Sequence, residues 1–308
     1  MNGEYTILDK NYTAFYIDKT QRLNREEIGK APYPMKFHYV DFNKLHLGYV
    51  QWHWHPEFEL NMVLQGSQQL SIGKENIVLS EGDGCFINAT TLHSISPSAG
   101  SECIHIGCVF APDIISGGSP LIFQKYVKPI QESQGLPCIA LRRSVPWQRN
   151  VLDRIFSMYD ILDKDEDMPE ISTRILLCEI WMMICGHYRE YLGSTPGKAE
   201  RLQEQRVKLM SEYINEHFSE PIELSDIAEH AHISVREAIR CFNNMLSMTP
   251  KQYLLDRRVT AARYLLEHST LTITEVAMDC GFNSSSYFSK IFTRHTGVSP
   301  HEYRKRLI

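Results

Sequence analysis

The sequence lacks any apolar run long enough to cross a membrane. Its most apolar stretch, residues 175–184, is ten residues long and contains Glu179, whereas a transmembrane helix needs about 20 apolar residues. The first residues carry no basic stretch followed by an apolar core, so we expect no signal peptide. These absences argue against a membrane protein and predict a cytoplasmic one.

The cysteines also lack the spacing that is typical of zinc-binding motifs or of disulfide-rich domains. Eight are present, and no two form a CxxC pair, which excludes the usual zinc-finger patterns and a disulfide scaffold. Aromatic residues make up 10% of the chain and the net charge is −5, so the chain is not disordered as a whole. At about 150 residues per domain, 308 residues predict two domains.

Charge is distributed unevenly along the chain. Residues 1–192 hold 17 Lys and Arg against 23 Asp and Glu, whereas residues 232–308 hold 11 against 6. A basic end on an acidic protein points to an anionic partner for that end. The alternative is that this excess of basic residues arose by chance, and the charge distribution alone does not decide between the two.

The residue pattern changes twice along the chain. Residues 36–110 show short apolar runs with turn signals at 65–67 and 80–84, which is typical of strands. Residues 121–192 show apolar residues at helical spacing, and 193–197 are small or helix-breaking residues. We therefore predict a β-barrel over 1–120, a helical segment over 121–192, a linker over 193–200 and an all-α domain over 201–308.

The C-terminal region repeats itself. Three features recur 50 residues later: Phe242 as Phe292, Thr249-Pro250 as Ser299-Pro300 and Tyr253 as Tyr303. Ile227-Ala228 recurs after 49 residues as Val276-Ala277, which predicts a turn one residue longer in the second copy. Each copy reads as helix, turn, helix, at about 225–246 and 272–295. Ser225, Ser234 and Thr272 are the expected helix caps, and this is the geometry of a helix-turn-helix unit, whose second helix enters the major groove of DNA.

A helix over 250–267 is expected to join the two units. It would be about 27 Å long, close to the roughly 34 Å between successive major grooves on one face of DNA. Arg257, Arg258 and Arg263 lie on this helix. They are either solvated surface residues or clamps for DNA phosphates.

The second copy carries a family signature. It reads Ala277-x3-Gly281-Phe282-x4-Tyr287-Phe288-Ser289-Lys290-x-Phe292-x4-Gly297-x-Ser299-Pro300-x2-Tyr303-Arg304. This resembles the C-terminal domain of AraC/XylS-type transcription regulators, over about residues 206–306. In the first copy, Ser247 stands where that family usually has glycine, which predicts a less regular helix end.

The resemblance implies which side chains face the bases of double-stranded DNA. By position they are Arg236, Ile239 and Arg240 in the first unit, and Ser285, Ser286 and Lys290 in the second. Arginine can bind guanine in a bidentate way, and isoleucine can contact a thymine methyl group. Contact with phosphates alone is the alternative for Arg236 and Lys290. With roughly five phosphate contacts, the logarithm of the DNA-binding constant should fall with the logarithm of the salt concentration at a slope of about −4.5.

The N-terminal half contains His53-x-His55-x3-Glu59 and, later, His93. On one continuous strand, His53, His55 and Glu59 would share a face, provided that Pro56 does not distort the strand. The spacing resembles the two sequence motifs of the cupin barrel, although the second motif is degraded. The cluster could line an organic-ligand pocket, bind a divalent transition metal, or have no ligand role.

Several residues of the helical segment form an apolar stripe. The stripe either contacts a second subunit or packs on the barrel, and the family resemblance favours a homodimer. Its members are Trp147, Ile155, Tyr159, Ile171, Ile175, Cys178 and Met182.

Together these features predict an α+β multidomain protein with a cupin-like barrel, a helical segment and two helix-turn-helix units. The expected function is a ligand-responsive, sequence-specific DNA-binding regulator and not an enzyme. The expected effector is a small metabolite, with carbohydrate as the best class. If the protein is an activator, as the resemblance favours, RNA polymerase is a partner. The alternatives are a metal-dependent cupin enzyme fused to a DNA-binding module and a constitutive regulator with an empty barrel.

Overall fold

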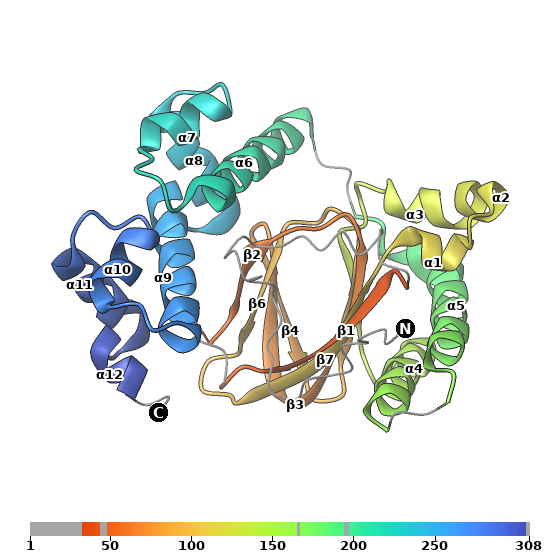
Figure 1. The fold of residues 1–308 in the computed structure, drawn as a ribbon. Helices are drawn as coiled ribbons and strands as arrows, with labels where there is room; N and C mark the ends of the chain where they lie inside the picture. The colour runs from red at the N-terminus through yellow and green to blue at the C-terminus, as the bar shows by residue number, and fades with distance from the viewer. Residues whose placement is uncertain (1–32, 44–47, 165–166, 194–196, 306–308) are drawn as a thin grey trace. The chain divides into compact units, whose positions relative to one another are not determined.

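The computed structural model describes residues 33–43, 48–164, 167–193 and 197–305. The chain divides into two compact units, and the described residues up to 193 belong to the first, those from 197 onward to the second. Figure 1 shows an antiparallel sheet followed by helices in the first unit and helices alone in the second, so the predicted fold class is confirmed. The expectations about the first residues and part of the linker lie outside the described residues. In the described ranges, no helix is long and apolar enough to cross a membrane.

The sheet of the first unit is built around one long strand, β3. β3 pairs with β7 and β5 along its first half and with β4 and β6 along its second half. β1 extends the sheet beyond β7, and β2 pairs with β6. The strands are β1 (Met35–Asp41), β2 (Val50–His53), β3 (Phe58–Ile72), β4 (Glu75–Ser80), β5 (Gly84–Ile87), β6 (His93–Pro97), β7 (Cys103–Phe110) and β8 (Cys138–Leu141).

Gly66 lies inside β3, so the turn predicted at 65–67 is wrong. Its φ is 76°, a conformation that favours glycine. A Cβ atom at Gly66 would lie 1.7 Å from the carbonyl oxygen of Glu102 on the neighbouring chain segment. A residue without a side chain is therefore required where β3 passes from one set of partners to the other. The turn predicted at 80–84 does separate β4 from β5.

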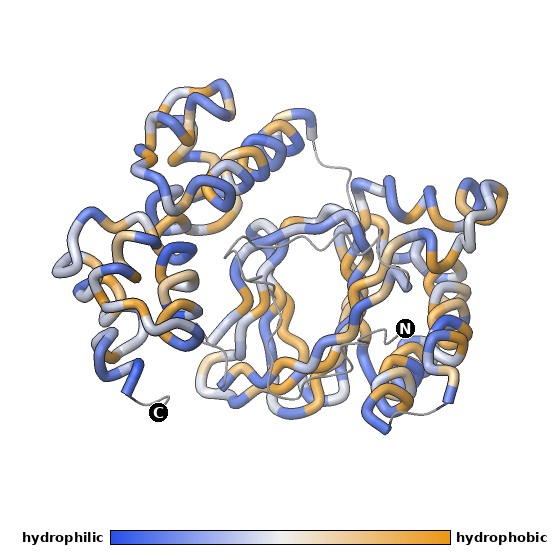
Figure 2. Tube along the Cα trace, in the orientation of Figure 1, coloured by the Kyte–Doolittle hydropathy of each residue, from blue (hydrophilic) through white to orange (hydrophobic). Residues whose placement is uncertain are grey.

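Successive residues of β3 face opposite sides of the sheet. Phe58 and Leu60 pack into the apolar core that the sheet forms with the helices, where the Phe58 ring lies 4.7 Å from that of Trp181. Glu59 and Asn61 are fully buried as well, on the opposite face. The tube in Figure 2 accordingly changes between orange and blue over short distances.

The helices of the first unit follow the sheet in sequence, with one exception. β8 lies inside the predicted helical segment and pairs with β5, so the prediction of helices alone over 121–192 was wrong at 138–141. The elements are α1 (Pro112–Ser116), α2 (Pro120–Ile122), the π-helical turn Phe123–Val127, α3 (Lys128–Gln131), α4 (Pro146–Asp163), α5 (Pro169–His187) and the 3-10 turn Tyr188–Tyr191.

The apolar stripe of the helical segment divides into two sets. Ile155 on α4 is fully buried in the core shared with the sheet. Ile171, Ile175 and Met182 on α5 are instead 59%, 56% and 67% exposed. Packing on the barrel is therefore excluded for these three residues within a single chain.

The second unit contains two helix-turn-helix units. α7 and α8 form the first, and α10 and α11 form the second. The intervening turns are residues 231–234 and 280–284, so the second turn is one residue longer. The helices are α6 (Lys198–His217), α7 (Leu224–His230), α8 (Val235–Leu246), α9 (Pro250–His268), α10 (Ile273–Asp279), α11 (Ser285–Thr296) and α12 (Pro300–Lys305).

Most of the predicted helix caps are present in the second unit. The side chains of Ser234 and Thr272 accept hydrogen bonds from backbone N–H groups in the first turns of α8 and α10. The N-cap position of α7, however, is Glu223 and not Ser225, and the backbone N–H of Glu223 donates a 2.7 Å hydrogen bond to the side chain of Asp226. Ser247 ends α8 with a φ of 55°, so this helix end is a regular left-handed cap occupied by a residue other than glycine.

The arginines of α9 are buried, which contradicts both predicted roles. Arg257, Arg258 and Arg263 are 1%, 9% and 5% exposed. The guanidinium of Arg258 donates two hydrogen bonds, each 2.7 Å long, to the carbonyl oxygens of Phe218 and Glu220. Arg257 lies 4.2 Å over the ring of Phe218. Arg257 and Arg258 thus pack α9 against the turn after α6, and all three arginines are too buried to act as solvated surface residues or as clamps for DNA phosphates.

Candidate functional site

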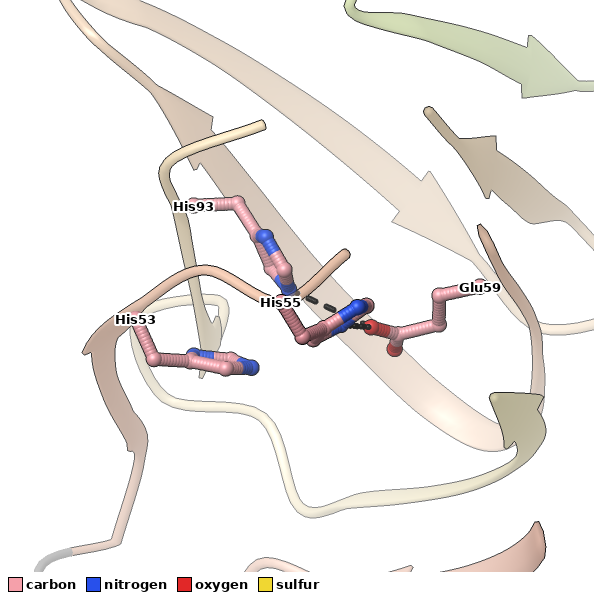
Figure 3. Close-up of side chains that lie close together, drawn as sticks. All are labelled: His53, His55, Glu59 and His93. Carbon is pink, nitrogen blue, oxygen red and sulfur yellow. Dashed lines mark hydrogen bonds and ion pairs between the residues drawn. The ribbon is translucent and has the colours of Figure 1, made fainter. Parts of the chain in front are cut away.

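The first unit brings the four predicted site residues His53, His55, Glu59 and His93 together, and we call them the His/Glu cluster. One ligand atom from each lies within 4.8 Å of the others. Figure 3 shows the three imidazoles and the carboxylate turned toward one point. His53 ends β2, Glu59 lies in β3 and His93 begins β6.

The motif does not lie on one continuous strand, so the condition under which His53, His55 and Glu59 would share a face is not met. β2 ends at His53 and β3 begins at Phe58, so residues 54–57 form an irregular connection. Pro56 has no N–H group and cannot take part in a ladder of hydrogen bonds. His55 therefore reaches the cluster from the connection rather than from a strand.

Glu59 is the centre of the His/Glu cluster. Its Oε2 lies 3.2 Å from the Nε2 atoms of both His55 and His93. Burial raises the pKa of Glu59, but the hydrogen bonds with the two histidines outweigh burial and hold the pKa well below its ordinary value. Burial lowers the pKa of His53, and the neighbouring histidines lower it further. The cluster thus contains a buried carboxylate beside several imidazoles.

A chain of buried polar side chains continues from Glu59 into the barrel. Asn61 donates a 3.3 Å hydrogen bond to Oε1 of Glu59 and accepts one of 3.1 Å from Gln68. The Oε1 atom of Gln68 is 2.7 Å from Nδ1 of His105. Asn61, Gln68 and His105 were not predicted as site residues, although Asn61 and Gln68 are polar residues in an otherwise apolar strand.

In the second unit, the predicted DNA-facing residues lie on α8 and α11. Arg236 and Arg240 on α8 are exposed, as are Ser286 and Lys290 on α11, whereas Ile239 and Ser285 are half-buried. Buried residues of the same helices, such as Phe242 and Phe292, face the core. Each helix therefore presents its polar face to solvent.

Arg240 is paired with a carboxylate on its own helix. Its guanidinium donates hydrogen bonds of 2.8 and 2.7 Å to the two carboxylate oxygens of Glu237. Arg206 donates a further hydrogen bond of 3.0 Å to Glu237. The hydrogen bond from Arg240 is the main cause that lowers the pKa of Glu237. Glu237 thus holds one predicted base-contacting side chain in place.

Both units match known domain families. The model of the AraC-like ligand-binding domain matches residues 42–110, and that of a helix-turn-helix domain matches residues 227–306. The HTH-type transcriptional regulator YdeC of Bacillus subtilis is 32% identical over 260 residues, which cover 84% of this chain and 87% of YdeC. The chain belongs to the AraC family of transcriptional regulators. It is a DNA-binding regulator with a ligand-binding domain, and the alternative of an enzyme is not supported.

Two further relatives have names that state what they regulate or how they act. The transcriptional activator RhaR of Cronobacter sakazakii is 37% identical over 144 residues, 46% of this chain and 49% of RhaR. The melibiose operon regulatory protein of Escherichia coli is 22% identical over 258 residues, 82% of this chain and 83% of that protein. Both are regulators similar to this AraC-family chain.

Proposed function

We propose that this AraC-family regulator reads two segments of its operator with α8 and α11. The observation that supports the proposal is the exposed polar face that each helix carries opposite its buried core residues. Arginine and lysine can donate to guanine O6 and N7, serine can bond to several bases, and isoleucine can contact thymine. The contacting residues are Arg236, Ile239 and Arg240 on α8, and Ser285, Ser286 and Lys290 on α11.

Salt dependence of DNA binding tests this proposal. We expect the affinity for a bound duplex to fall with salt at a log–log slope of about −4.5, if roughly five phosphates are contacted. Arg240→Ala should weaken specific binding by about 1–3 kcal/mol. Lys198→Ala, which removes an exposed charge from the first turn of α6, is the matched control. A slope near zero, or equal losses in both variants, would contradict the proposal.

The His/Glu cluster is the proposed sensor site for a small metabolite. It lies in the matched ligand-binding domain, and the side chain of His55 is 14% exposed, which leaves the cluster accessible from solvent. Carbohydrate is the proposed class of effector, supported by the name of the melibiose operon regulatory protein. The similarity to RhaR, a transcriptional activator, supports the proposal of an activator, for which RNA polymerase is the partner.

A thermal-shift screen against sugars and other metabolites tests the sensor. A ligand at 100 times its Kd stabilises the fold that binds it by about 2.7 kcal/mol. The four tryptophans, at positions 52, 54, 147 and 181, all lie in the first unit. The melting temperature measured by tryptophan fluorescence therefore shows whether a ligand stabilises the first unit. A shift that His55→Ala abolishes supports the site. A shift that persists in this variant places the effector elsewhere, and a first unit that no metabolite stabilises favours the constitutive alternative.

The exposed apolar face of α5 supports a homodimer as the assembly. Its residues line a shallow groove together with Tyr33 and Cys178, and their spacing is that of alternating a and d positions of a coiled coil. An antiparallel second copy, with a two-fold axis midway between residues 175 and 178, would place each a position against a d position. The facing pairs would be Ile171 with Met182 and Ile175 with Cys178.

Sedimentation velocity tests the dimer. Ile175→Asp places a charge in the middle of this face, so we expect it to yield monomers at concentrations where the wild type is dimeric. Leu121→Asp is the matched control, because Leu121 is 72% exposed on α2 in the same unit. Dissociation by both variants, or by neither, would rule out this face as the interface.

A further inference from the structure

Glu237 occupies a position that other helices of the second unit use for a capping box. At the start of α6, α7, α9, α10 and α12, the backbone N–H of the N-cap residue donates a hydrogen bond of 2.7 to 3.0 Å to the side chain three residues later. α8 has Ser234 at its N-cap and Glu237 three residues later. The carboxylate of Glu237 nevertheless accepts hydrogen bonds from Arg240 and Arg206 instead. This difference indicates a role for Glu237 other than capping.

The carboxylate of Glu237 holds one edge of the Arg240 guanidinium. Nε of Arg240 donates to Oε2 at 2.8 Å, and Nη2 donates to Oε1 at 2.7 Å. A guanidinium has five N–H donors in one plane, so two hydrogens on Nη1 and one on Nη2 are left. Nη1 and Nη2 form a second fork at the end of the side chain. Arg240 is exposed, so it can offer this end fork to a ligand without releasing Glu237.

Arg206 fixes the same carboxylate from a second helix. It lies in α6, and its Nη1 donates a hydrogen bond of 3.0 Å to Oε1 of Glu237. Arg206 and Glu237 are half-buried, whereas Arg240 is exposed. A single carboxylate close to DNA would repel the phosphates, but two arginines and one glutamate together carry a net positive charge. The half-buried end of this group is thus anchored, and its exposed end is compatible with DNA.

We infer that Glu237 is a positioning residue that makes Arg240 select guanine. The inference rests on the proposed function of α8 as a reader of DNA. Guanine presents O6 and N7 as adjacent acceptors in the major groove, and these match one fork of an arginine. A side chain that is already held in one orientation loses less conformational freedom on binding. Without Glu237, Arg240 is free to turn to phosphates, and contacts with phosphates carry no sequence information.

The second helix-turn-helix unit has no equivalent of this pair. Tyr287 stands fifty residues after Glu237, at the third position of α11, and Lys290 stands in the place of Arg240. A tyrosine has no carboxylate, and a lysine lacks the planar fork of an arginine. The second unit therefore serves as an internal control, because a change at Glu237 should not alter the bases that α11 prefers.

Base preferences of the full-length protein test the inference. They are measured on a duplex selected from a random library, on its single-base variants and on a scrambled duplex of equal length. We expect the wild type to favour guanine at one position by about 5–150-fold, the range for a bidentate contact. Glu237→Gln should lose most of this preference and bind the scrambled duplex at least as tightly as the wild type does. Its salt slope should be steeper by up to about 0.9, because Arg240 can then reach a phosphate.

Two further variants separate positioning from other roles. Glu204→Gln is the matched control, because it removes a half-buried carboxylate of α6 whose Oε1 lies 2.6 Å from Nζ of Lys208. It should leave the guanine preference unchanged. In an Arg240→Ala background, Glu237→Gln should have no further effect on base preference, because Glu237 acts through Arg240. Circular dichroism shows whether each variant folds, and Glu237→Asp, whose shorter side chain weakens the fork, replaces Glu237→Gln if that variant does not.

The possible failures can be told apart. If Arg240→Ala abolishes the guanine preference but Glu237→Gln retains it, α8 reads DNA as proposed and the inference about Glu237 is overturned. Equal weakening of all duplexes by Glu237→Gln also overturns it, because loss of a carboxylate that stabilises the first turn of α8 has that effect. So does a change that persists in the Arg240→Ala background, since Glu237 then contacts a base itself. If Arg240→Ala leaves every preference unchanged, the proposed role of Arg240 fails together with the inference.

Discussion

Replacement of Arg258 by alanine should destabilise the DNA-binding unit alone. Arg258 lies in α9 and is 9% exposed, and its two hydrogen bonds go to the carbonyl oxygens of Phe218 and Glu220. Its guanidinium also lies 5.8 Å from the ring of Phe282 in the second helix-turn-helix unit. The side chain thus ties the turn after α6 to the second half of the unit.

The magnitude follows from these contacts. A hydrogen bond from a charged group contributes about 1.5–3 kcal/mol. At the lower limit, the loss of two such bonds lowers the free energy of unfolding by about 3 kcal/mol. We use the lower limit because water can enter part of the space that the side chain vacates and bind the two carbonyl oxygens. With an m-value of about 2 kcal/mol per molar urea, the unfolding midpoint of the second unit should fall by about 1.5 M. Arg258→Lys should recover only part of the loss, because an ammonium group lacks the planar fork.

Two optical probes separate the units in one experiment. All four tryptophans lie in the first unit, so fluorescence follows that unit, whereas circular dichroism at 222 nm includes the helices of both. Arg258→Ala should add an earlier transition to the dichroism curve and leave the fluorescence midpoint unchanged. An unchanged dichroism curve would refute the account of the buried arginine, and equal shifts in both signals would show that its effect is not confined to the second unit.

Two other changes concern the same unit and use the same dichroism assay. Ser247 ends α8 at a φ of 55°, so Ser247→Gly should stabilise the unit by about 1 kcal/mol; a lower midpoint would contradict this. The hydrogen bond to Asp256 raises the pKa of His295. The stability that this pair contributes is complete below the ordinary histidine pKa of about 6.5 and is lost as the pH rises through the higher folded-state pKa. Asp256→Asn should remove this part of the pH dependence, and a wild-type-like pH profile in the variant would argue against the pair.

The helix-turn-helix units were predicted well because their signals are local. Caps such as Ser234 and Thr272 act on backbone groups three residues away, so a short stretch of sequence contains both partners. The added residue in the second turn followed from comparison of the two copies. The family resemblance followed from the same region.

The features that were missed depend on partners far away in the sequence. Arg258 follows Asp256 and Arg257 in α9, yet its partners are carbonyls about 40 residues earlier, which no local pattern indicates. β8 is four residues long and is stabilised by pairing with β5. The motif with His53, His55 and Glu59 was visible in the sequence, but the network from Asn61 to His105 exists only once the sheet has closed.

The central proposal is that α8 and α11 contact the bases of two separate DNA segments. Selection of bound duplexes from a random library, with the wild type, Arg240→Ala, Lys290→Ala and Lys198→Ala, tests this. We expect the wild type and Lys198→Ala to enrich the same sequence in two segments. Arg240→Ala should relax the base preference in one segment only, and Lys290→Ala in the other only. No enriched sequence, or unchanged preferences in both variants, would contradict the account.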